Sequence, residues 1–314
     1  MSLAAFLELV EARTKLASIL PCLIGVLFAA AYFGQIDAVN TGLFFVAMLL
    51  FDMTTTAINN LMDYRKAHST AYRTQTNVLG RRHLAPKRVL GLIIVMLTIA
   101  SLLGVVLVWR TQWILLFIGG ACFVIGIFYT FGPLPLSRLP LGEVFSGVTM
   151  GLGIPVIAAF VNVPATALFR VTWAWPDLFV SGNWVALLTL GLVCVTPMAT
   201  IANVMLANNL SDLEEDRANH RLTLPMYLGH DLALGVYQVL AYSGYVALVL
   251  AVALGLLGWP VLIAGVSLPW VVSNTRQFAR HQDKRLTFHT AIKTLIAANL
   301  GVIIGLALDW GWRL

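Results

Sequence analysis

Long apolar runs dominate this sequence and restrict it to folds that cross a membrane. Hydrophobic residues make up 59% of the 314 residues, and charged residues only 11%. A helix needs about 20 apolar residues to cross the hydrocarbon core of a bilayer. Because unpaired backbone groups are not tolerated in lipid, we expect an all-α polytopic membrane protein, a bundle of nine transmembrane helices. The nine predicted spans are 14–34, 40–62, 88–109, 112–131, 141–163, 184–208, 231–256, 259–275 and 290–309.

The connections between these runs indicate one domain. Several runs are separated by only a few residues, such as Trp109-Arg110-Thr111, which predicts tight helical hairpins. The sequence contains no low-complexity tail and no Pro/Gly-rich linker, so residues 1–314 are expected to form a single integral-membrane domain. The three cysteines, Cys22, Cys122 and Cys194, lie singly in different spans and are interpreted as small packing residues.

The distribution of cations predicts the topology. With the N-terminus in the cytoplasm, 17 of the 20 Lys and Arg residues fall on the inner side, and only Arg110, Arg170 and Arg313 fall on the outer side. This asymmetry fits the positive-inside rule and an odd number of spans. The net charge of +6 therefore reflects the topology and a positively charged opening on the cytoplasmic side, and no nucleic-acid partner is expected.

A first polar cluster follows the second run. Residues spaced by three, four and seven positions place one polar stripe on this predicted helix: Asp52, Thr55, Thr56, Asn59 and Asp63. An Asp at mid-span costs on the order of 2.5–3.5 kcal/mol, so Asp52 should face a wet interior. Polar groups also join helices in membrane bundles, and for Asp52 alone this reading is preferred over a ligand role. Asn59, Asn60 and Asp63 together favour a functional site.

A second polar cluster follows the sixth run. Asn208, Asp212 and Asp216 are four residues apart and therefore share one face of a helix. Two carboxylates so placed in a low-dielectric mouth favour a cation between them. Magnesium, held by carboxylates and phosphate oxygens, is the natural choice. The neighbouring Glu214 and Glu215 fit a solvated loop that faces water.

Cations suited to a diphosphate surround these acids. Arginine in particular makes bidentate contacts with phosphate oxygens. Residues 81–88 are explained equally well by binding anionic lipid headgroups. Both polar loops, about 63–88 and 212–230, fall on the cytoplasmic side, which predicts one cytoplasm-facing site for magnesium and a diphosphate. The candidate cations are Arg65, Lys66, Arg73, Arg81, Arg82, Arg138, Arg217 and Arg221.

At full length, the pattern resembles the intramembrane aromatic prenyltransferase (UbiA-type) superfamily. Members of this family carry an Asn-rich aspartate motif after the second helix and a DxxxD motif after the sixth. Residues 9–15 resemble the opening of the branch that acts on 1,4-dihydroxy-2-naphthoate, and residues 51–66 resemble the same branch in low-GC Gram-positive bacteria. Residues 129–143 resemble the family's segment between helices four and five. The chain departs from the family pattern at Asn60, where an acid is frequent, and at Ala67, where the last Asp would be.

The resemblance implies transfer of a polyprenyl chain from an allylic polyprenyl diphosphate to an aromatic acceptor in a bacterial plasma membrane. The acceptor implied is 1,4-dihydroxy-2-naphthoate, giving demethylmenaquinone, carbon dioxide and diphosphate, with Mg²⁺ as cofactor. Residues implied in catalysis are Asp63, Asp212, Asp216, Arg138 and Tyr129. Residues implied in diphosphate binding are Asn59, Asn60, Arg65, Lys66, Asn208, Arg217 and Arg221. The implied metal ligands are Asn59, Asp63, Asp212 and Asp216.

Three alternatives differ in what they require. A family member using 4-hydroxybenzoate, haem B, homogentisate or chlorophyllide would carry nearly the same motifs. An ion-coupled transporter predicts similar halves or helices broken at the bilayer midplane, whereas the strongest acids here sit at one membrane face. A CDP-alcohol phosphotransferase requires a DGxxAR string, which the sequence does not contain.

Overall fold

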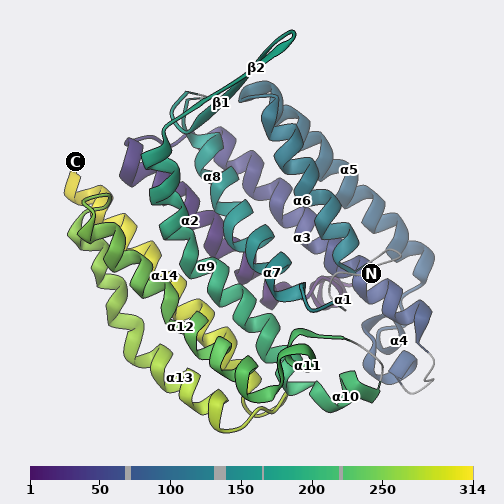
Figure 1. Cartoon of the computed structure of the whole chain (residues 1–314). Coiled ribbons are helices and arrows are strands. Elements are labelled where there is room, and N and C mark those ends of the chain that lie inside the picture. The colour runs from purple at the N-terminus through teal and green to yellow at the C-terminus, as the bar shows by residue number, and fades with distance from the viewer. Residues whose placement is uncertain (68–71, 131–138, 165, 219–221, 314) are drawn as a thin grey trace.

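The structure is a bundle of long helices lying side by side, with short helices at one end and a β-hairpin at the other (Figure 1). It is a computed structural model that describes residues 1–67, 72–130, 139–164, 166–218 and 222–313. The elements of the first half are α1 (Leu3–Leu9), η1 (Ala12–Lys15), α2 (Leu16–Phe33), α3 (Ala38–Lys66), η2 (Tyr72–Thr76), α4 (Val78–Arg81), α5 (Pro86–Arg110), α6 (Ile114–Thr130), α7 (Gly142–Ser146), η4 (Gly147–Gly153) and α8 (Ile154–Asn162). Those of the second half are β1 (Phe169–Ala174), β2 (Asp177–Gly182), α9 (Trp184–Ser211), α10 (Leu213–Ala218), α11 (Leu224–Leu228), α12 (His230–Ala253), η5 (Trp259–Ser267), α13 (Leu268–Arg280) and α14 (Phe288–Arg313).

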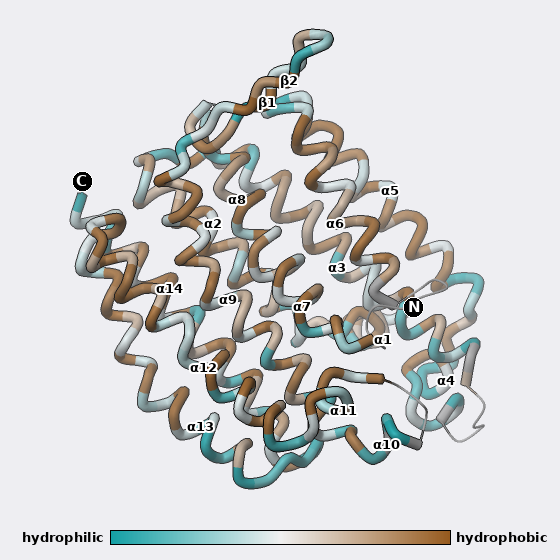
Figure 2. Tube along the Cα trace, in the orientation of Figure 1, coloured by the Kyte–Doolittle hydropathy of each residue, from teal (hydrophilic) through white to brown (hydrophobic). Residues whose placement is uncertain are grey.

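The helices confirm the predicted all-α polytopic membrane fold. Within the described residues, seven helical segments are long and apolar enough to cross a bilayer, and each coincides with a predicted span. They are Ala12–Phe33, Ala38–Arg65, Pro86–Arg110, Gly142–Asn162, Trp184–Ser211, His230–Ala253 and Phe288–Arg313. Figure 2 shows apolar residues along these helices and hydrophilic residues gathered at the end that carries α4, α10 and α11.

The other two predicted spans correspond to shorter helices. Residues 112–131 coincide with α6, which has 17 residues. Residues 259–275 form η5, a 3₁₀ helix, followed by α13, whose first turn contains Pro269. A proline lacks the backbone N–H that would continue the preceding helix, so the run is divided at this point. A total of nine spans therefore stays a prediction.

A β-hairpin between α8 and α9 was not anticipated from the sequence. β1 and β2 pair antiparallel, and the Ala174–Asp177 pair closes the hairpin around Trp175 and Pro176. Residues 169–180 are rich in aromatic and β-branched side chains, which favour strands. The hairpin lies at the end of the bundle opposite α10 and α11 (Figure 1), and Trp175 is 85% exposed. Exposed tryptophan is typical of a membrane–water interface.

Close packing around α9 depends on two glycines of η4. A Cβ atom on Gly147 would lie 2.8 Å from the carbonyl oxygen of Met198, and one on Gly151 would lie 2.4 Å from the Met198 Cα atom. The spacing of four residues puts both glycines on one face, as in small-xxx-small helix contacts in membranes. These glycines let the backbones of η4 and α9 approach directly.

We predict that Gly151→Ala lowers the free energy of unfolding by about 1–3 kcal/mol, because the added methyl group overpacks the η4–α9 contact. Gly191→Ala, on α9 itself, is the matched control, since a Cβ atom there meets open space. Thermal unfolding in detergent, followed by tryptophan fluorescence, measures both. Equal melting temperatures for the two variants would contradict the packing role of Gly151.

Candidate active site

The polar stripe on α3 faces a cavity inside the bundle. This cavity has a volume of about 510 Å³, and Asp52, Thr55, Thr56 and Asn59 all line it. Most of its other lining residues are apolar and come from α3, α5, α6, η4 and α8. The stripe predicted from residue spacing is therefore confirmed over these four residues, and Asp63 follows one turn further toward the end of α3.

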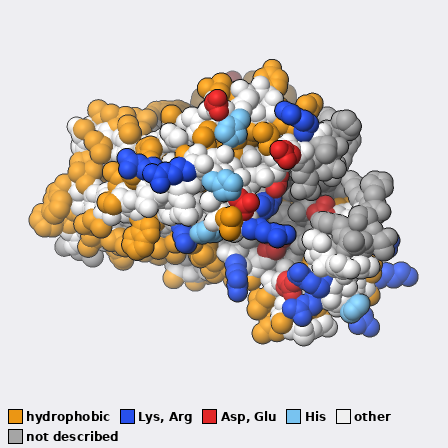
Figure 3. Space-filling view, turned by 90° about the horizontal axis from the view of Figure 1, so that it is seen from below, with side chains coloured by type: hydrophobic (Ala, Val, Ile, Leu, Met, Phe, Trp, Pro, Cys, Tyr) orange, Lys and Arg blue, Asp and Glu red, His pale blue; other side chains and the backbone are white. Residues whose placement is uncertain are grey.

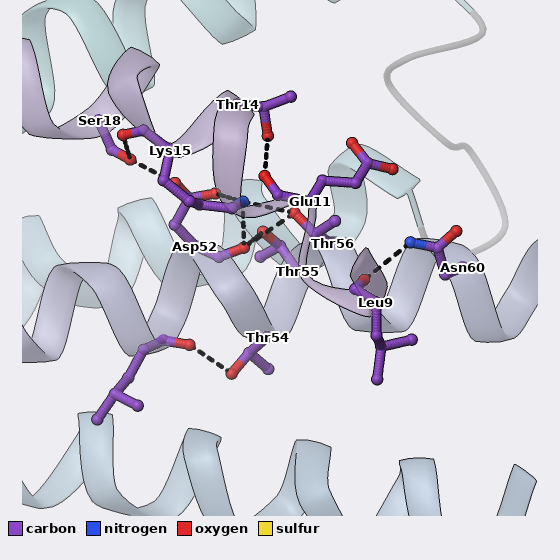
Figure 4. Close-up of polar contacts among 11 residues, drawn as sticks. Leu9, Glu11, Thr14, Lys15, Ser18, Asp52, Thr54, Thr55, Thr56 and Asn60 are labelled. Carbon is purple, nitrogen blue, oxygen red and sulfur yellow. Dashed lines mark hydrogen bonds and ion pairs between the residues drawn. The ribbon is translucent and has the colours of Figure 1, made fainter. Parts of the chain in front are cut away.

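Asp52 is neutralised by a buried lysine (Figure 4). Lys15 donates hydrogen bonds to Asp52 Oδ1 at 2.6 Å and to Thr56 Oγ1 at 2.7 Å. Ser18 donates to the other carboxylate oxygen of Asp52. This network joins η1 and α2 to α3, so Asp52 makes the helix–helix contact that was preferred for it from the sequence.

Asn60 fixes the end of α3 to its neighbours. Its side-chain amide donates to the carbonyl of Leu9 at 3.0 Å, and Asn77 donates to the backbone carbonyl of Asn60 at 3.0 Å. Asn77 also caps α4, where its side chain accepts from the N–H of Leu79. The first cluster is therefore held by the α1–η1 junction and by α4.

Two of the predicted diphosphate cations have another partner. Arg81 and Arg82 both pair with Glu8 of α1, and Arg82 Nε lies 2.7 Å from Glu8 Oε2. The hydrogen bonds from Arg82 and then Arg81 lower the pKa of the half-buried Glu8 carboxyl. These arginines fix α4 to α1 in this structure.

Arg73 lies over the ring of Tyr64, with its guanidinium carbon 4.7 Å from the ring centroid.

The second cluster spans the junction of α9 and α10. The continuous helix assumed from the spacing is interrupted, because α9 ends at Ser211 and Asp212 is its C-cap. The N–H of Asp212 still bonds to the carbonyl of Asn208 at 3.1 Å, and the N–H of Asp216 bonds to that of Asp212 at 2.8 Å. The spacing of four residues therefore persists in the backbone across the break. Asp216 is buried, whereas Arg217 is exposed.

Two residues beside this cluster were not assigned to the site from the sequence. Lys284, from the connection between α13 and α14, pairs with Asp212 and donates to Asn208 Oδ1 at 2.7 Å. Glu143 of α7 is buried and accepts a hydrogen bond from Asn209 at 2.8 Å. The signal for Glu143 was an acid within an apolar run. Lys284 lies 72 positions from Asp212, so no local pattern pointed to it.

The environment of Asp212 fits a cation. A carboxylate oxygen of Asp212 and the amide oxygen of Asn208 already converge on the ammonium group of Lys284. Such oxygen donors are the ligands that magnesium prefers. Among the described residues, no group of three or more His, Cys, Asp or Glu side chains could hold a metal ion alone. A magnesium ion here would therefore take its further oxygens from a bound diphosphate or from water.

Both clusters lie at the same end of the bundle. Figure 1 shows the end of α3, near α4, and the short helix α10 at the end opposite the β-hairpin. In the view from this end (Figure 3), Lys, Arg, Asp and Glu side chains surround a hollow. Arg65 is exposed at the end of α3. The predictions for Arg138 and Arg221 fall outside the described residues, as do those for the side chains of Lys66 and Tyr129.

Comparison with known proteins identifies the class of this fold. Residues 18–298 match the UbiA prenyltransferase family. The chain superposes on a UbiA homolog from Aeropyrum pernix K1 with a TM-score of 0.67 and 15% identity, covering 91% of this chain and 97% of that one. For a UbiA homolog from Archaeoglobus fulgidus bound to DMAPP and Mg²⁺, the TM-score is 0.60 at 13% identity, with 97% and 98% covered.

Sequence comparison finds a relative whose identity to this chain is higher than that of these two solved structures. The chain is 30% identical over 269 residues to the 1,4-dihydroxy-2-naphthoate octaprenyltransferase of Bacillus subtilis (strain 168), covering 84% of this chain and 75% of that protein. The chain therefore belongs to the UbiA prenyltransferase family, and it is a multi-pass membrane protein.

We predict that Lys15→Met lowers the free energy of unfolding by about 3 kcal/mol, because it leaves the Asp52 carboxylate without its counter-charge. The double variant Lys15→Met/Asp52→Leu should recover at least half of this loss, since it removes both charges. A denaturation series in mixed micelles on the unaltered protein, Lys15→Met, Asp52→Leu and the double variant gives the four free energies. Simple addition of the two single effects would refute the coupling.

Proposed function

We propose that this protein transfers a polyprenyl chain from an allylic polyprenyl diphosphate to 1,4-dihydroxy-2-naphthoate. The similarity to the Bacillus subtilis octaprenyltransferase supports this acceptor. The observation that carries the proposal is the cavity along α3, which is apolar over most of its lining and polar where Asp52, Thr56 and Asn59 line it. Such a cavity matches a substrate with a long hydrocarbon tail and a charged head.

The apolar part of the cavity suits the prenyl tail. Phe44, Met48, Leu107 and Leu115 line it away from the polar stripe. Several side chains of the adjoining helices α5 and α6, such as Leu102 and Phe117, are exposed on the outside of the bundle, as expected for helices that meet lipid. A tail bound here would pass from the polar end of α3 toward the bilayer.

The polar end suits the diphosphate. Asn59 and Asp63 on α3, and Asp212 and Asp216 at the α9–α10 junction, would hold magnesium together with diphosphate oxygens. Magnesium bound there would neutralise the diphosphate and stabilise charge on the departing oxygen. Arg65 and Arg217, which are exposed at the same two segments, would share that charge.

The cavity wall would protect the allylic cation left after the carbon–oxygen bond breaks. Phe51 and Phe123 both line the cavity, and their rings stack with centroids 3.9 Å apart. Aromatic faces stabilise a nearby cation, and an apolar wall excludes water that would quench it. The cation then forms a carbon–carbon bond to the ring, and the ring carboxyl group leaves as carbon dioxide. No oxidant takes part, so the immediate product is the quinol form of demethylmenaquinone.

The acceptor is tested by product analysis. Membranes containing this protein, supplied with Mg²⁺ and a polyprenyl diphosphate, should convert 1,4-dihydroxy-2-naphthoate to its prenylated, decarboxylated quinol. The same membranes should leave 4-hydroxybenzoate and homogentisate unchanged. Prenylation of one of these other acceptors, with none of the naphthoate, would overturn the proposed acceptor while keeping the family reaction.

We predict that Asp63→Ala, Asp212→Ala and Asp216→Ala each lower the magnesium-dependent rate at least about 100-fold, since each removes charge stabilisation at the diphosphate. Expression should stay near normal. Glu214→Ala is the matched control, because Glu214 lies between two of these acids and is exposed. Full activity of any one Asp variant would remove that residue from the proposed site.

A further inference from the structure

Lys284 meets the second polar cluster from a different part of the chain. Its ammonium group donates to Asn208 Oδ1 at 2.7 Å and also contacts Asp212 Oδ2. The Asp212 side chain is only 16% exposed, whereas that of Lys284 is 48% exposed. The carboxylate is therefore fixed in the protein wall, and the lysine reaches it from the solvent side.

The connection that carries Lys284 is held by its own hydrogen bonds. Asp283 Oδ1 accepts from the N–H groups of Leu286 at 2.6 Å and Arg285 at 2.8 Å. These two bonds lower the pKa of the Asp283 carboxyl, so it stays ionised at neutral pH. Thr287, which is buried, donates to the carbonyl of His281 and accepts from the N–H of Asp283. The backbone at Lys284 is thus anchored on both sides, and only the side chain is free to change its partner.

The oxygens that hold this lysine belong to the residues proposed above for the metal and the diphosphate. An ammonium group and a magnesium ion compete for the same oxygen lone pairs, so a magnesium ion bound at Asp212 would displace Lys284. The displaced ammonium group would stay within one side-chain length of the site, because its backbone is held by the hydrogen bonds above. A lysine ammonium group is a compact charge on a flexible side chain, so it can move to bind nearby phosphate oxygens.

We propose that Lys284 is a diphosphate-binding residue that occupies the Asp212–Asn208 oxygens until metal and diphosphate arrive. The inference rests on the proposed function, because it uses the same diphosphate. It adds a positive charge from the α13–α14 connection to the charges of Arg65 and Arg217, which lie beside the two polar clusters. A lysine with this role has two opposite effects: it weakens binding of the metal alone and strengthens binding of the diphosphate.

Two binding measurements on the purified full-length protein in detergent test these effects. The first is the affinity for Mn²⁺ alone, read by electron paramagnetic resonance. The second is the affinity for inorganic pyrophosphate at saturating Mn²⁺, read by calorimetry. Lys284→Met should bind Mn²⁺ at least threefold more tightly than the unaltered protein and pyrophosphate at least fivefold more weakly. Lys284→Arg should restore pyrophosphate binding to within about twofold, since it keeps the charge.

Arg285→Met is the matched control, because Arg285 is the exposed neighbour of Lys284 on the same connection, and it should change neither affinity. If Lys284→Met leaves both affinities unchanged, or moves both in the same direction, the inference is wrong. Asp212→Asn separates this failure from failure of the proposed function. Loss of Mn²⁺-dependent pyrophosphate binding in Asp212→Asn, with no effect of Lys284→Met, overturns only the role of Lys284. Unchanged binding in Asp212→Asn overturns the proposed site itself.

Discussion

The need to neutralise charge in a low-dielectric interior governs how this protein is built. Lys15 and Asp52 form an ion pair inside the bundle. At the far end of α14, Arg313 Nη2 lies 3.1 Å from Oδ2 of the buried Asp309. An unpaired charge in such surroundings costs several kcal/mol, so each is placed where a partner meets it. The same constraint supports the diphosphate site that we propose at the end of the bundle with α10, because acids gathered there favour a bound cation.

Helix α9 connects the packed core to this end. Near its middle, Gly147 and Gly151 bring η4 against the backbone of Met198. Near its end, Asn209 bonds to the buried Glu143 of α7, and the adjacent Asn208 faces Lys284. A rigid helix seated by close backbone packing is a firm support for Asp212, and precise placement of charge is what electrostatic catalysis requires.

The sequence predicted the features that depend on local free energies. The cost of placing each residue in lipid is local, so hydropathy located the seven long helices. The period of 3.6 residues is local as well, so the stripe from Asp52 to Asn59 could be assigned to one face, and the cavity lies against that face. The clustering of Asn208, Asp212 and Asp216 in the sequence is likewise a local signal.

Features that depend on contacts distant in the sequence could not be predicted in this way. Lys284 reaches Asp212 only because the α13–α14 connection folds back beside α9. The pairing of Arg81 and Arg82 with Glu8 depends on where α1 packs, so these cations could not be separated from the candidate diphosphate ligands beforehand. Two local features were missed for a different reason: the spacing of the acids does not reveal the break after Ser211, and the strand-favouring residues of the β-hairpin at 169–182 lie between two predicted spans.

We propose that the acids of α3 and those of the α9–α10 junction bind one diphosphate through divalent metal. The most direct measurement is an experimental density map of the protein with Mn²⁺ and a non-reactive thio-analogue of geranyl diphosphate, with manganese located by its anomalous signal. We expect manganese beside Asp63 and beside Asp212, with a single diphosphate between them and the prenyl tail in the cavity along α3. Manganese at only one of the two acids, or a diphosphate that contacts only one cluster, would contradict it.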